Sequence, residues 1–274
     1  MSDRYAVIGH PVEHSLSPAI HAEFARATAQ DIAYARILAP LAGFKAAVTG
    51  FRDEGGKGAN VTLPFKREAW QLVEAHAGDA RDAAAVNTID FRDGRMTGYN
   101  TDGTGLVTDL ERNLGFPIRG KRVLLMGAGG ASYGVLRPLL GARPRDVAVA
   151  NRTLDKASAL VARFQEFASL ATAGLSARPY DRLAGSQFDL IINATSAGLT
   201  GQMPPLPQGL FAPGALAYDM VYGKSTPFMQ FAVTCGARAA DGLGMLVEQA
   251  AESFFIWRGV RPQTAPVIEM LRKA

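Results

Sequence analysis

The chain of 274 residues is long enough for one large domain or two modest ones, and its length favours two. Hydrophobic residues make up 48% of it and charged residues 20%, which is the balance of a soluble globular protein. No apolar run approaches the roughly 20 residues of a membrane-spanning helix, so no membrane partner is expected. The formal net charge of +4 favours small anionic ligands over nucleic acid, because no basic run is interleaved with aromatic residues.

The first residues, MSDRYAVIGHPVEHS, lack the apolar core and the small-residue cleavage site of a signal peptide. Cys235 is the single cysteine, so no disulfide can form within the chain. Together these features predict a cytoplasmic location. We interpret Cys235 as a small packing residue that ends a helix before Gly236, and not as a nucleophile.

The N-terminal third of the chain predicts strands alternating with helices. The stretch RYAVIGHPV is typical of a short buried strand that ends near Gly9. In the next segment, SLSPAIHAEFARATAQ, the pattern predicts a helix with Ser17 as its N-cap and Pro18 at its first position. A second strand is predicted at IAYARIL, and GANVTLP leads into a helix that begins near Phe65.

The middle of the chain predicts a hairpin, a helix and then a parallel sheet. Two short strands joined at Asp93-Gly94 are expected in VNTIDFRDGRMTGYN. A helix follows in TDGTGLVTDLERNLG, with Thr101 or Asp102 near its start. Beyond Gly115, strand and helix patterns alternate regularly, which favours an α/β fold with helices on both faces of a parallel sheet.

A glycine-rich turn joins the first strand of that alternating region to its helix. In VLLMGAGGASYG, residues 123–134, Gly127, Gly129 and Gly130 allow the backbone to approach a phosphate at a helix N-terminus. Ser132 stands at the third glycine position of the usual pattern. Because the turn lies between a strand and a helix within repeated βα units, it predicts dinucleotide binding.

The residues after the second strand of this region predict which dinucleotide binds. An NAD-preferring site usually carries an acidic residue here, which accepts hydrogen bonds from the ribose 2′-OH. This chain has Asn151, Arg152 and Thr153, with Lys156 one turn later. A guanidinium can bind a 2′-phosphate in a bidentate manner, so the pattern favours NADP. A solvated surface arginine is the alternative.

Two other chemistries are not supported by the sequence. Residues 130–134 match the G-x-S-x-G motif of serine hydrolases, but that fold places its histidine after the serine, and all four histidines here precede Ser132. Zinc catalysis would need three protein ligands, and Cys235 with the pair His10 and His14 does not make a convincing set. No metal site is therefore expected.

One lysine lies at an unusual place, at the start of a predicted helix. In NVTLPFKREAW, Lys66 follows a short apolar stretch and a proline. A solvated surface position is the ordinary interpretation of such a lysine, and a functional position is the alternative. The residues around it do not decide between the two.

Nine polar and glycine-rich motifs, spread over almost the whole chain, occur in an order that closely resembles the shikimate dehydrogenase family. They are HSLSP (14–18), NVTLPFK (60–66), AAVNTI (84–89), GYNTDG (98–103), GAGGAS (127–132), NRT (151–153), NATSAG (193–198), YDMVYG (218–223) and DGLGMLVEQA (241–250). The resemblance implies NADP-linked interconversion of 3-dehydroshikimate and shikimate, in aromatic amino-acid biosynthesis. A paralogue acting on quinate and a non-catalytic NADP- or shikimate-binding regulator are the alternatives.

The resemblance also implies a role for individual residues. Lys66 and Asp102 would be the catalytic pair beside the reacting C3 oxygen, although Asp102 can also serve as a helix N-cap. The substrate-binding residues would be Ser15, Ser17, Thr62, Asn87, Tyr222 and Gln249. The cofactor-binding residues would be Gly127, Ala128, Gly129, Gly130, Ala131, Asn151, Arg152, Thr153, Lys156, Met220 and Gly242.

A two-domain organisation follows from the same resemblance. Residues 1–101 together with 242–274 would form an N-terminal α/β substrate-binding and catalytic domain. Residues 102–241 would form a Rossmann-type parallel-sheet NADP domain, with a cleft between the two domains. The protein is expected to act on a small-molecule substrate as a monomer or a homodimer.

Overall fold

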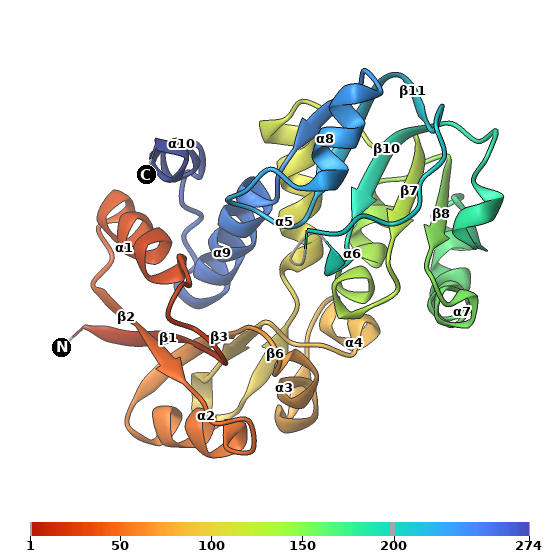
Figure 1. Ribbon diagram of the computed structural model, residues 1–274. Helices are drawn as coiled ribbons and strands as arrows, with labels where there is room; N and C mark the ends of the chain where they lie inside the picture. The colour runs from red at the N-terminus through yellow and green to blue at the C-terminus, as the bar shows by residue number, and fades with distance from the viewer. Residues whose placement is uncertain (1, 198–200, 274) are drawn as a thin grey trace. The chain divides into compact units, whose positions relative to one another are not determined.

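The computed structural model describes residues 2–197 and 201–273, and it divides into two compact units (Figure 1). The first unit comprises the chain up to Gly105 and again from Leu246 onward. The second unit comprises Leu106–Met245. Each unit holds one six-stranded sheet, so the predicted α/β class is confirmed.

The sheet of the first unit is mixed, with strand order β2-β1-β3-β5-β6-β4. Its strands are β1 (Asp3–Gly9), β2 (Ile32–Leu38), β3 (Gly56–Val61), β4 (Ala75–His76), β5 (Thr88–Asp90) and β6 (Thr97–Tyr99). The accompanying helices are α1 (Ser17–Thr28), α2 (Phe44–Asp53), α3 (Lys66–Leu72), α4 (Ala80–Ala83), α5 (Asp102–Thr108), α9 (Leu243–Arg258) and α10 (Ala265–Lys273). The last three residues of α5 and the first three of α9 belong to the second unit. β1 runs parallel to β2 and β3, whereas β5 is antiparallel to β3 and β6.

Two apolar clusters cover the two faces of this sheet. On one face, Ile8 of β1 packs with Phe44 of α2 and with Phe65, the residue before α3. On the other face, Ile20 of α1 packs with Phe254 of α9 and with residues of α10. Figure 1 shows α2 and α3 on one side of the sheet and α1 and α9 on the other. Burial on both faces fixes the strand register, because a slip of one residue would turn apolar side chains outward.

The structure confirms the predicted hairpin and corrects the predicted start of α1. β5 and β6 pair antiparallel, and a 3₁₀ turn lies between them at Arg92–Gly94. α1 begins at Ser17 itself, with Leu16 at the N-cap position, so the prediction of Ser17 as N-cap is wrong. The physical reason lies two residues earlier, where the Ser15 hydroxyl oxygen accepts the backbone N–H of Ser17 at 3.3 Å.

The sheet of the second unit is entirely parallel, with strand order β12-β11-β10-β7-β8-β9. Its strands are β7 (Arg122–Met126), β8 (Asp146–Ala150), β9 (Gly174–Arg178), β10 (Phe188–Asn193), β11 (Phe211–Asp219) and β12 (Arg238–Ala240). The helices are α6 (Gly130–Gly141), α7 (Leu154–Leu170) and α8 (Pro227–Thr234), with a π-helical turn at Asp109–Asn113 and a 3₁₀ turn at Tyr180–Arg182. The strand order reverses between β7 and β10, which is the topology of a dinucleotide-binding sheet.

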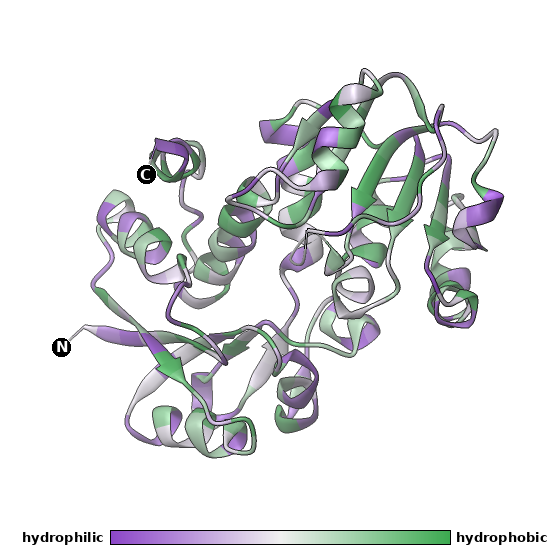
Figure 2. Ribbon diagram, viewed as in Figure 1, coloured by the Kyte–Doolittle hydropathy of each residue, from purple (hydrophilic) through white to green (hydrophobic). Residues whose placement is uncertain are grey.

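Helices cover both faces of this second sheet, as the alternating pattern predicted. Val123 and Leu125 of β7 pack in the cluster that includes α6 and α7, whereas Leu124 and Met126 pack in the cluster that includes α8. Figure 2 shows that the central strands of this sheet are coloured as hydrophobic. Strands buried on both faces carry such continuous apolar runs.

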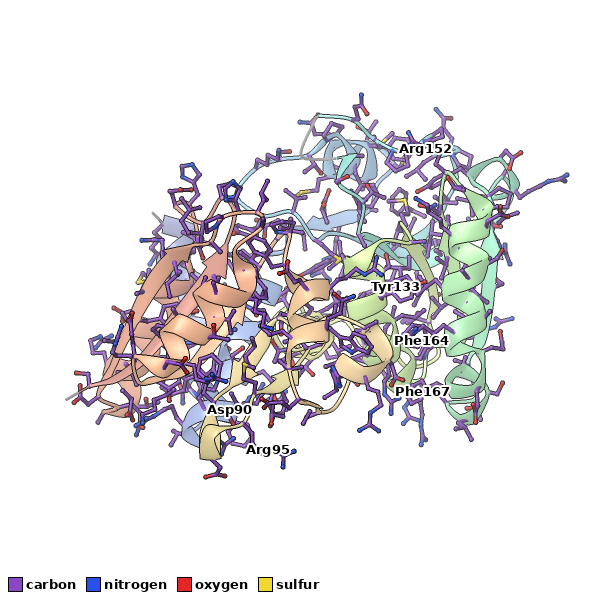
Figure 3. All side chains as sticks on the ribbon, turned by 90° about the horizontal axis from the view of Figure 1, so that it is seen from below. Asp90, Arg95, Tyr133, Arg152, Phe164 and Phe167 are labelled. Carbon is purple, nitrogen blue, oxygen red and sulfur yellow. The ribbon has the colours of Figure 1, made fainter. Side chains whose placement is uncertain are left out.

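Aromatic contacts fix α6 against α7. The ring of Tyr133 lies 6.3 Å from that of Phe164, and the guanidinium of Arg137 stacks 4.4 Å above Phe167 (Figure 3). β9 and β12 were not predicted from the sequence. Both are short strands at the two edges of the sheet with half-exposed side chains, so they lack the apolar run that marks the central strands.

Three remaining features concern predictions made from composition. Cys235 lies at the C-cap of α8, as predicted, and it is half-buried. Within residues 2–197 and 201–273, no helix is both long enough and apolar enough to cross a bilayer. In the same ranges, no group of three or more His, Cys, Asp or Glu side chains is arranged to hold a metal ion.

Candidate active site

A short ion pair between Lys66 and Asp102 is the central feature of the first unit. Lys66 Nζ lies 2.6 Å from Asp102 Oδ2, although the two residues are 36 positions apart in sequence. The side chain of Lys66 is 29% exposed and that of Asp102 is 11% exposed. A pair this close and this sheltered from water interacts more strongly than an exposed surface pair. Lys66 is therefore not an ordinary solvated surface lysine.

The start of α3 fixes the position of Lys66. Phe65, the residue before it, is buried and stacks on Phe44 with ring centroids 4.7 Å apart. The backbone carbonyl of Lys66 also accepts the N–H of Val86 at 2.8 Å. These contacts hold the backbone of the first helical residue in place, and the ion pair with Asp102 holds the end of its side chain.

Asp102 is held by neighbours on both sides of its carboxylate. Oδ2 accepts Lys66, and Oδ1 accepts the side-chain amide of Asn87 at 2.8 Å. Asp102 is the first residue of α5, and its backbone N–H donates to the side-chain oxygen of Asn100 at 3.1 Å. Its carboxylate thus contacts Lys66 and Asn87, while Asn100 supplies the capping interaction. Sequence analysis missed Asn100, although it lies in the motif GYNTDG.

Gln249 of α9 belongs to the same hydrogen-bonded group. Its side-chain oxygen lies 3.4 Å from the Asn87 amide nitrogen and 3.4 Å from the Thr101 hydroxyl. Its amide nitrogen donates to the Leu246 carbonyl at 2.8 Å, which fixes the orientation of the side chain. Four of the residues singled out from the sequence, Lys66, Asp102, Asn87 and Gln249, are thereby joined in one network.

Ser15, Ser17 and Thr62 lie outside this network. Among the residues that the structure describes, no hydrogen bond joins any of the three to Lys66 or Asp102. Ser17 is buried, and Ser15 is half-buried with its carbonyl accepting the Arg36 guanidinium at 2.7 Å. Thr62 follows β3, and its methyl group fills the space that a side chain at Gly9 would occupy.

In the second unit, the glycine turn after β7 forms one wall of a cavity of about 850 Å³. Gly127 has a φ of +103°, and a Cβ there would lie 3.1 Å from the Ala194 carbonyl oxygen. Only glycine fits this turn without strain, because the backbone must take a positive φ beside a neighbouring strand end. The predicted cofactor residues that line the cavity are Gly127, Ala128, Gly129, Asn151, Arg152, Thr153 and Lys156.

The rest of the cavity lining comes from residues that sequence analysis did not assign to the cofactor. They are Pro179, Tyr180 and Asp181, residues 194–197, and Gln202 to Pro205. Burial raises the pKa of Tyr180 to about 12, so its phenol stays protonated near neutral pH. Residues 194–197 belong to the motif NATSAG and follow β10, which pairs with β7. The reversal of strand order at this point was the signal that could have found them.

Four predicted cofactor residues do not line the described part of this cavity. Gly130 and Ala131 continue into α6. Met220 and Gly242 lie next to each other elsewhere in the unit, since a Cβ on Gly242 would be 2.4 Å from the Met220 carbonyl oxygen. Tyr222 lies on the loop after β11, as Met220 does, and it is 36% exposed.

Charge and shape both make the cavity suitable for a phosphorylated dinucleotide. The positive charges of Arg152 and Lys156 line it, and the residue directly after β8 is the neutral Asn151. Arg152 lies at the end of that strand (Figure 3). No carboxylate therefore stands at the position that selects the ribose 2′-OH of NAD. The residues present fit NADP.

Comparison with known proteins identifies the family. The chain matches the shikimate dehydrogenase substrate binding domain over residues 7–89, the shikimate/quinate 5-dehydrogenase family over residues 110–200, and the shikimate 5′-dehydrogenase C-terminal domain over residues 242–272. It is 58% identical to a shikimate dehydrogenase (NADP(+)) of Methylobacillus flagellatus, across 99% of this chain and 100% of that protein.

The chain belongs to the shikimate dehydrogenase family.

Solved structures agree with this assignment of the family. An Ael1 enzyme from Pseudomonas putida superposes with a TM-score of 0.92 and 49% identity, covering 98% of both chains. A shikimate 5-dehydrogenase of Thermus thermophilus, solved with NADP(H) and shikimate, gives a TM-score of 0.87 and 34% identity, covering 99% of both chains. The predicted resemblance to the shikimate dehydrogenase family is confirmed.

Proposed function

We propose that the protein is an NADP-dependent oxidoreductase that interconverts 3-dehydroshikimate and shikimate by hydride transfer at C3. The observation that carries this proposal is the 2.6 Å contact between Lys66 and Asp102, in a chain of the shikimate dehydrogenase family. A regulator that only bound NADP or shikimate would have no use for a sheltered lysine–carboxylate pair. A role in aromatic amino-acid biosynthesis follows from this reaction.

Lys66 and Asp102 act as the catalytic pair in this proposal. When bound, the cofactor supplies the hydride acceptor or donor. In the reductive direction negative charge grows on the C3 oxygen, and the Lys66 ammonium stabilises that charge and passes a proton to it. Asp102 keeps the ammonium in place through Oδ2, while its other oxygen is held by Asn87. In the oxidative direction the same pair removes the proton from the hydroxyl.

The proposed substrate-binding residues suit a small polyhydroxylated acid. Its carboxylate is bound by the hydroxyl groups of Ser15 and Ser17. Its ring hydroxyls are bound by Thr62, Asn87, Tyr222 and Gln249. Recognition of this kind needs several convergent polar groups, because an apolar pocket discriminates poorly between hydroxylated analogues. Burial raises the pKa of Tyr222, so its phenol keeps a proton that it can donate to the substrate.

NADP occupies the cavity of the second unit in this proposal. The backbone of residues 127–131 faces the pyrophosphate at the N-terminus of α6, where oriented N–H groups favour anions. The adenosine 2′-phosphate is held by Asn151, Arg152, Thr153 and Lys156. The nicotinamide lies beside Met220 and Gly242. The glycine turn supports this assignment, because the positive φ of Gly127 and its close approach to Ala194 leave no room for a side chain, so backbone lines the cavity at this position.

We also propose the division of labour within the chain. Residues 1–101 and 242–274 form the substrate-binding and catalytic domain, and residues 102–241 form the NADP domain. The two compact units support these boundaries, since they divide after Gly105 and after Met245. A cytoplasmic location and a monomeric or homodimeric state belong to the same proposal, and light scattering on the purified protein tests the second of these.

A steady-state assay of reduced-nicotinamide absorbance tests the proposal. Purified protein is offered shikimate or quinate, each with NADP⁺ or NAD⁺. We expect turnover with shikimate and NADP⁺. Quinate is the second candidate substrate, because the family matched by residues 110–200 is described for both shikimate and quinate. Turnover with quinate alone would replace the proposed substrate, and no turnover with either would favour a regulator.

A further inference from the structure

A cluster of buried polar side chains lies behind Asn87, in the first unit. Asn60, from the motif NVTLPFK, faces Thr88 across the antiparallel pair β3–β5, and Ser253 of α9 lies over both. Thr88 and Ser253 are completely buried, and Asn60 is 6% exposed. Burying three polar groups in a core costs free energy unless each is hydrogen-bonded, so their arrangement calls for a reason beyond packing.

Every polar group of the cluster has a partner. The Asn60 amide nitrogen donates to Ser253 Oγ at 3.0 Å, to Thr88 Oγ1 at 3.1 Å and to the Asn87 carbonyl at 3.2 Å. Its oxygen accepts the hydroxyl of Tyr34 at 2.7 Å. Because burial raises the pKa of Tyr34, that hydroxyl stays protonated and fixes which end of the Asn60 amide faces the cluster.

The Thr88 hydroxyl of the cluster, together with the Thr101 backbone N–H and the Asp102 carboxylate, determines the orientation of the Asn87 amide. Its oxygen accepts the Thr88 hydroxyl at 3.0 Å and the backbone N–H of Thr101 at 2.9 Å. Its nitrogen must then point the other way, toward Asp102 Oδ1 at 2.8 Å. In the flipped orientation the amide oxygen would face the carboxylate, and the nitrogen would face a backbone donor. Both contacts would be repulsive, so the orientation is specified.

We propose that Thr88, Asn60 and Ser253 are positioning residues for the reaction. They hold the Asn87 amide so that it keeps Asp102 Oδ1 in place, while Asp102 Oδ2 holds Lys66. The inference rests on the proposed function, because it assigns these three buried groups to the geometry of the Lys66–Asp102 pair. None of them contacts that pair directly, so they act through Asn87.

A matched pair of variants at one position tests the inference. Thr88→Val removes the hydroxyl at nearly constant shape, whereas Thr88→Ser keeps the hydroxyl and removes a methyl group. Since a small misplacement of a catalytic group can cost about 100-fold in rate, we expect Thr88→Val to lower kcat for shikimate oxidation between about tenfold and 100-fold. Thr88→Ser is expected to keep kcat within about threefold of the wild type, and both variants should bind NADP⁺ as the wild type does.

A second variant tests the same inference in case Thr88→Val does not fold. Ser253→Ala removes an acceptor from the Asn60 amide and a hydrogen-bond partner from the Thr88 hydroxyl, but it retains a good helix former in α9. We expect it to lower kcat in the same direction, with NADP⁺ affinity measured by calorimetry unchanged. Thermal unfolding of each variant is measured alongside, because a purely structural role would lower the Tm and leave kcat of the folded protein intact.

The outcomes separate this inference from the function on which it rests. Wild-type kcat in Thr88→Val and in Ser253→Ala would overturn the inference and leave the proposed function standing. Equal losses in Thr88→Val and Thr88→Ser would also overturn it, since the loss of kcat would then not depend on whether the hydroxyl is present. No turnover by the wild type would overturn the proposed function, and the inference with it.

Discussion

The two units of the molecule prepare their functional residues in different ways. In the first unit, Lys66, Asp102 and Asn87 are already bonded to one another, and the polar groups behind them are buried and paired. In the second unit, seven of the proposed cofactor residues line an open cavity of about 850 Å³. Residues that follow β7, β8 and β10 line it, and the side chains of Arg152, Thr153 and Lys156 are exposed.

The difference follows from what each site has to do. Proton transfer requires donor and acceptor within hydrogen-bond distance, so its residues gain from being fixed before the substrate arrives. A dinucleotide is held by many contacts along its length, with backbone N–H groups for phosphate and long cationic side chains for charge. Substitutions in the first unit should therefore act on kcat, and those in the second on cofactor affinity.

The largest expected effect is at Lys66. Lys66→Ala removes the ammonium that would stabilise charge on the C3 oxygen in the proposed mechanism, and loss of a general acid or base costs on the order of 10³-fold in rate. We expect kcat to fall by that factor in the steady-state assay, while NADP⁺ affinity stays unchanged. Lys57→Ala is the matched control, since Lys57 is an exposed lysine of the same unit. Similar turnover in the two variants would remove Lys66 from the mechanism.

Much of this contrast could be predicted from the sequence, but by different routes. The cofactor turn is a local pattern, because strand, glycines and helix follow one another within residues 122–141. The pairing of Lys66 with Asp102 is not local, and only the resemblance to a family indicated it. The role of Asn60 could not be read from its motif, because its partners come from β2, β5 and α9. Side-chain networks of this kind form only when distant segments pack together.

A second expected effect concerns the choice of cofactor. Replacing both Arg152 and Lys156 with alanine removes the positive charges that line the cavity. Because hydrogen bonds to charged groups contribute about 1.5–3 kcal/mol, we expect the Kd for NADP⁺ to rise about 10- to 100-fold and that for NAD⁺ to change little. Titration of both cofactors by calorimetry measures this, with the exposed Arg119→Ala as control. An equal rise in the Kd for NADP⁺ and for NAD⁺ would show that neither residue binds the 2′-phosphate.

A third prediction concerns stability, and it applies to the first unit only. All four histidines of the chain lie there, and His21 is completely buried, stacked on Tyr34 at 4.2 Å. Burial lowers the pKa of His21 to about 3, whereas an unfolded histidine titrates near 6.5. Below about pH 6.5 the unfolded state binds a proton that the folded state does not. The free energy of unfolding therefore falls as the pH drops toward 3.

The variant His21→Phe keeps the aromatic stack and removes the titration. At pH 5 the wild type has lost about 2 kcal/mol through this group, from about 1.5 pH units at 1.36 kcal/mol each. Between pH 7.5 and pH 5, we therefore expect the free energy of unfolding of the wild type to fall by about 2 kcal/mol more than that of His21→Phe. Urea unfolding at each pH measures the difference. A constant difference between the two proteins would contradict the prediction.

The smallest expected effect is at Ser132, where this chain departs from the usual third glycine of the dinucleotide turn. Ser132 is completely buried, and its hydroxyl donates to the Gly127 carbonyl at 2.8 Å. The side chain thus ties the first turn of α6 to the glycine turn. Ser132→Ala should lower the free energy of unfolding by about 1 kcal/mol, the usual contribution of one hydrogen bond. The Kd for NADP⁺ should stay within about threefold, because the proposed phosphate contacts come from backbone N–H groups. A larger loss of NADP⁺ affinity at an unchanged free energy of unfolding would mean that the Ser132 hydroxyl itself holds the cofactor. The second unit would then resemble the first, because its function would depend on a side chain that is fixed before the ligand binds.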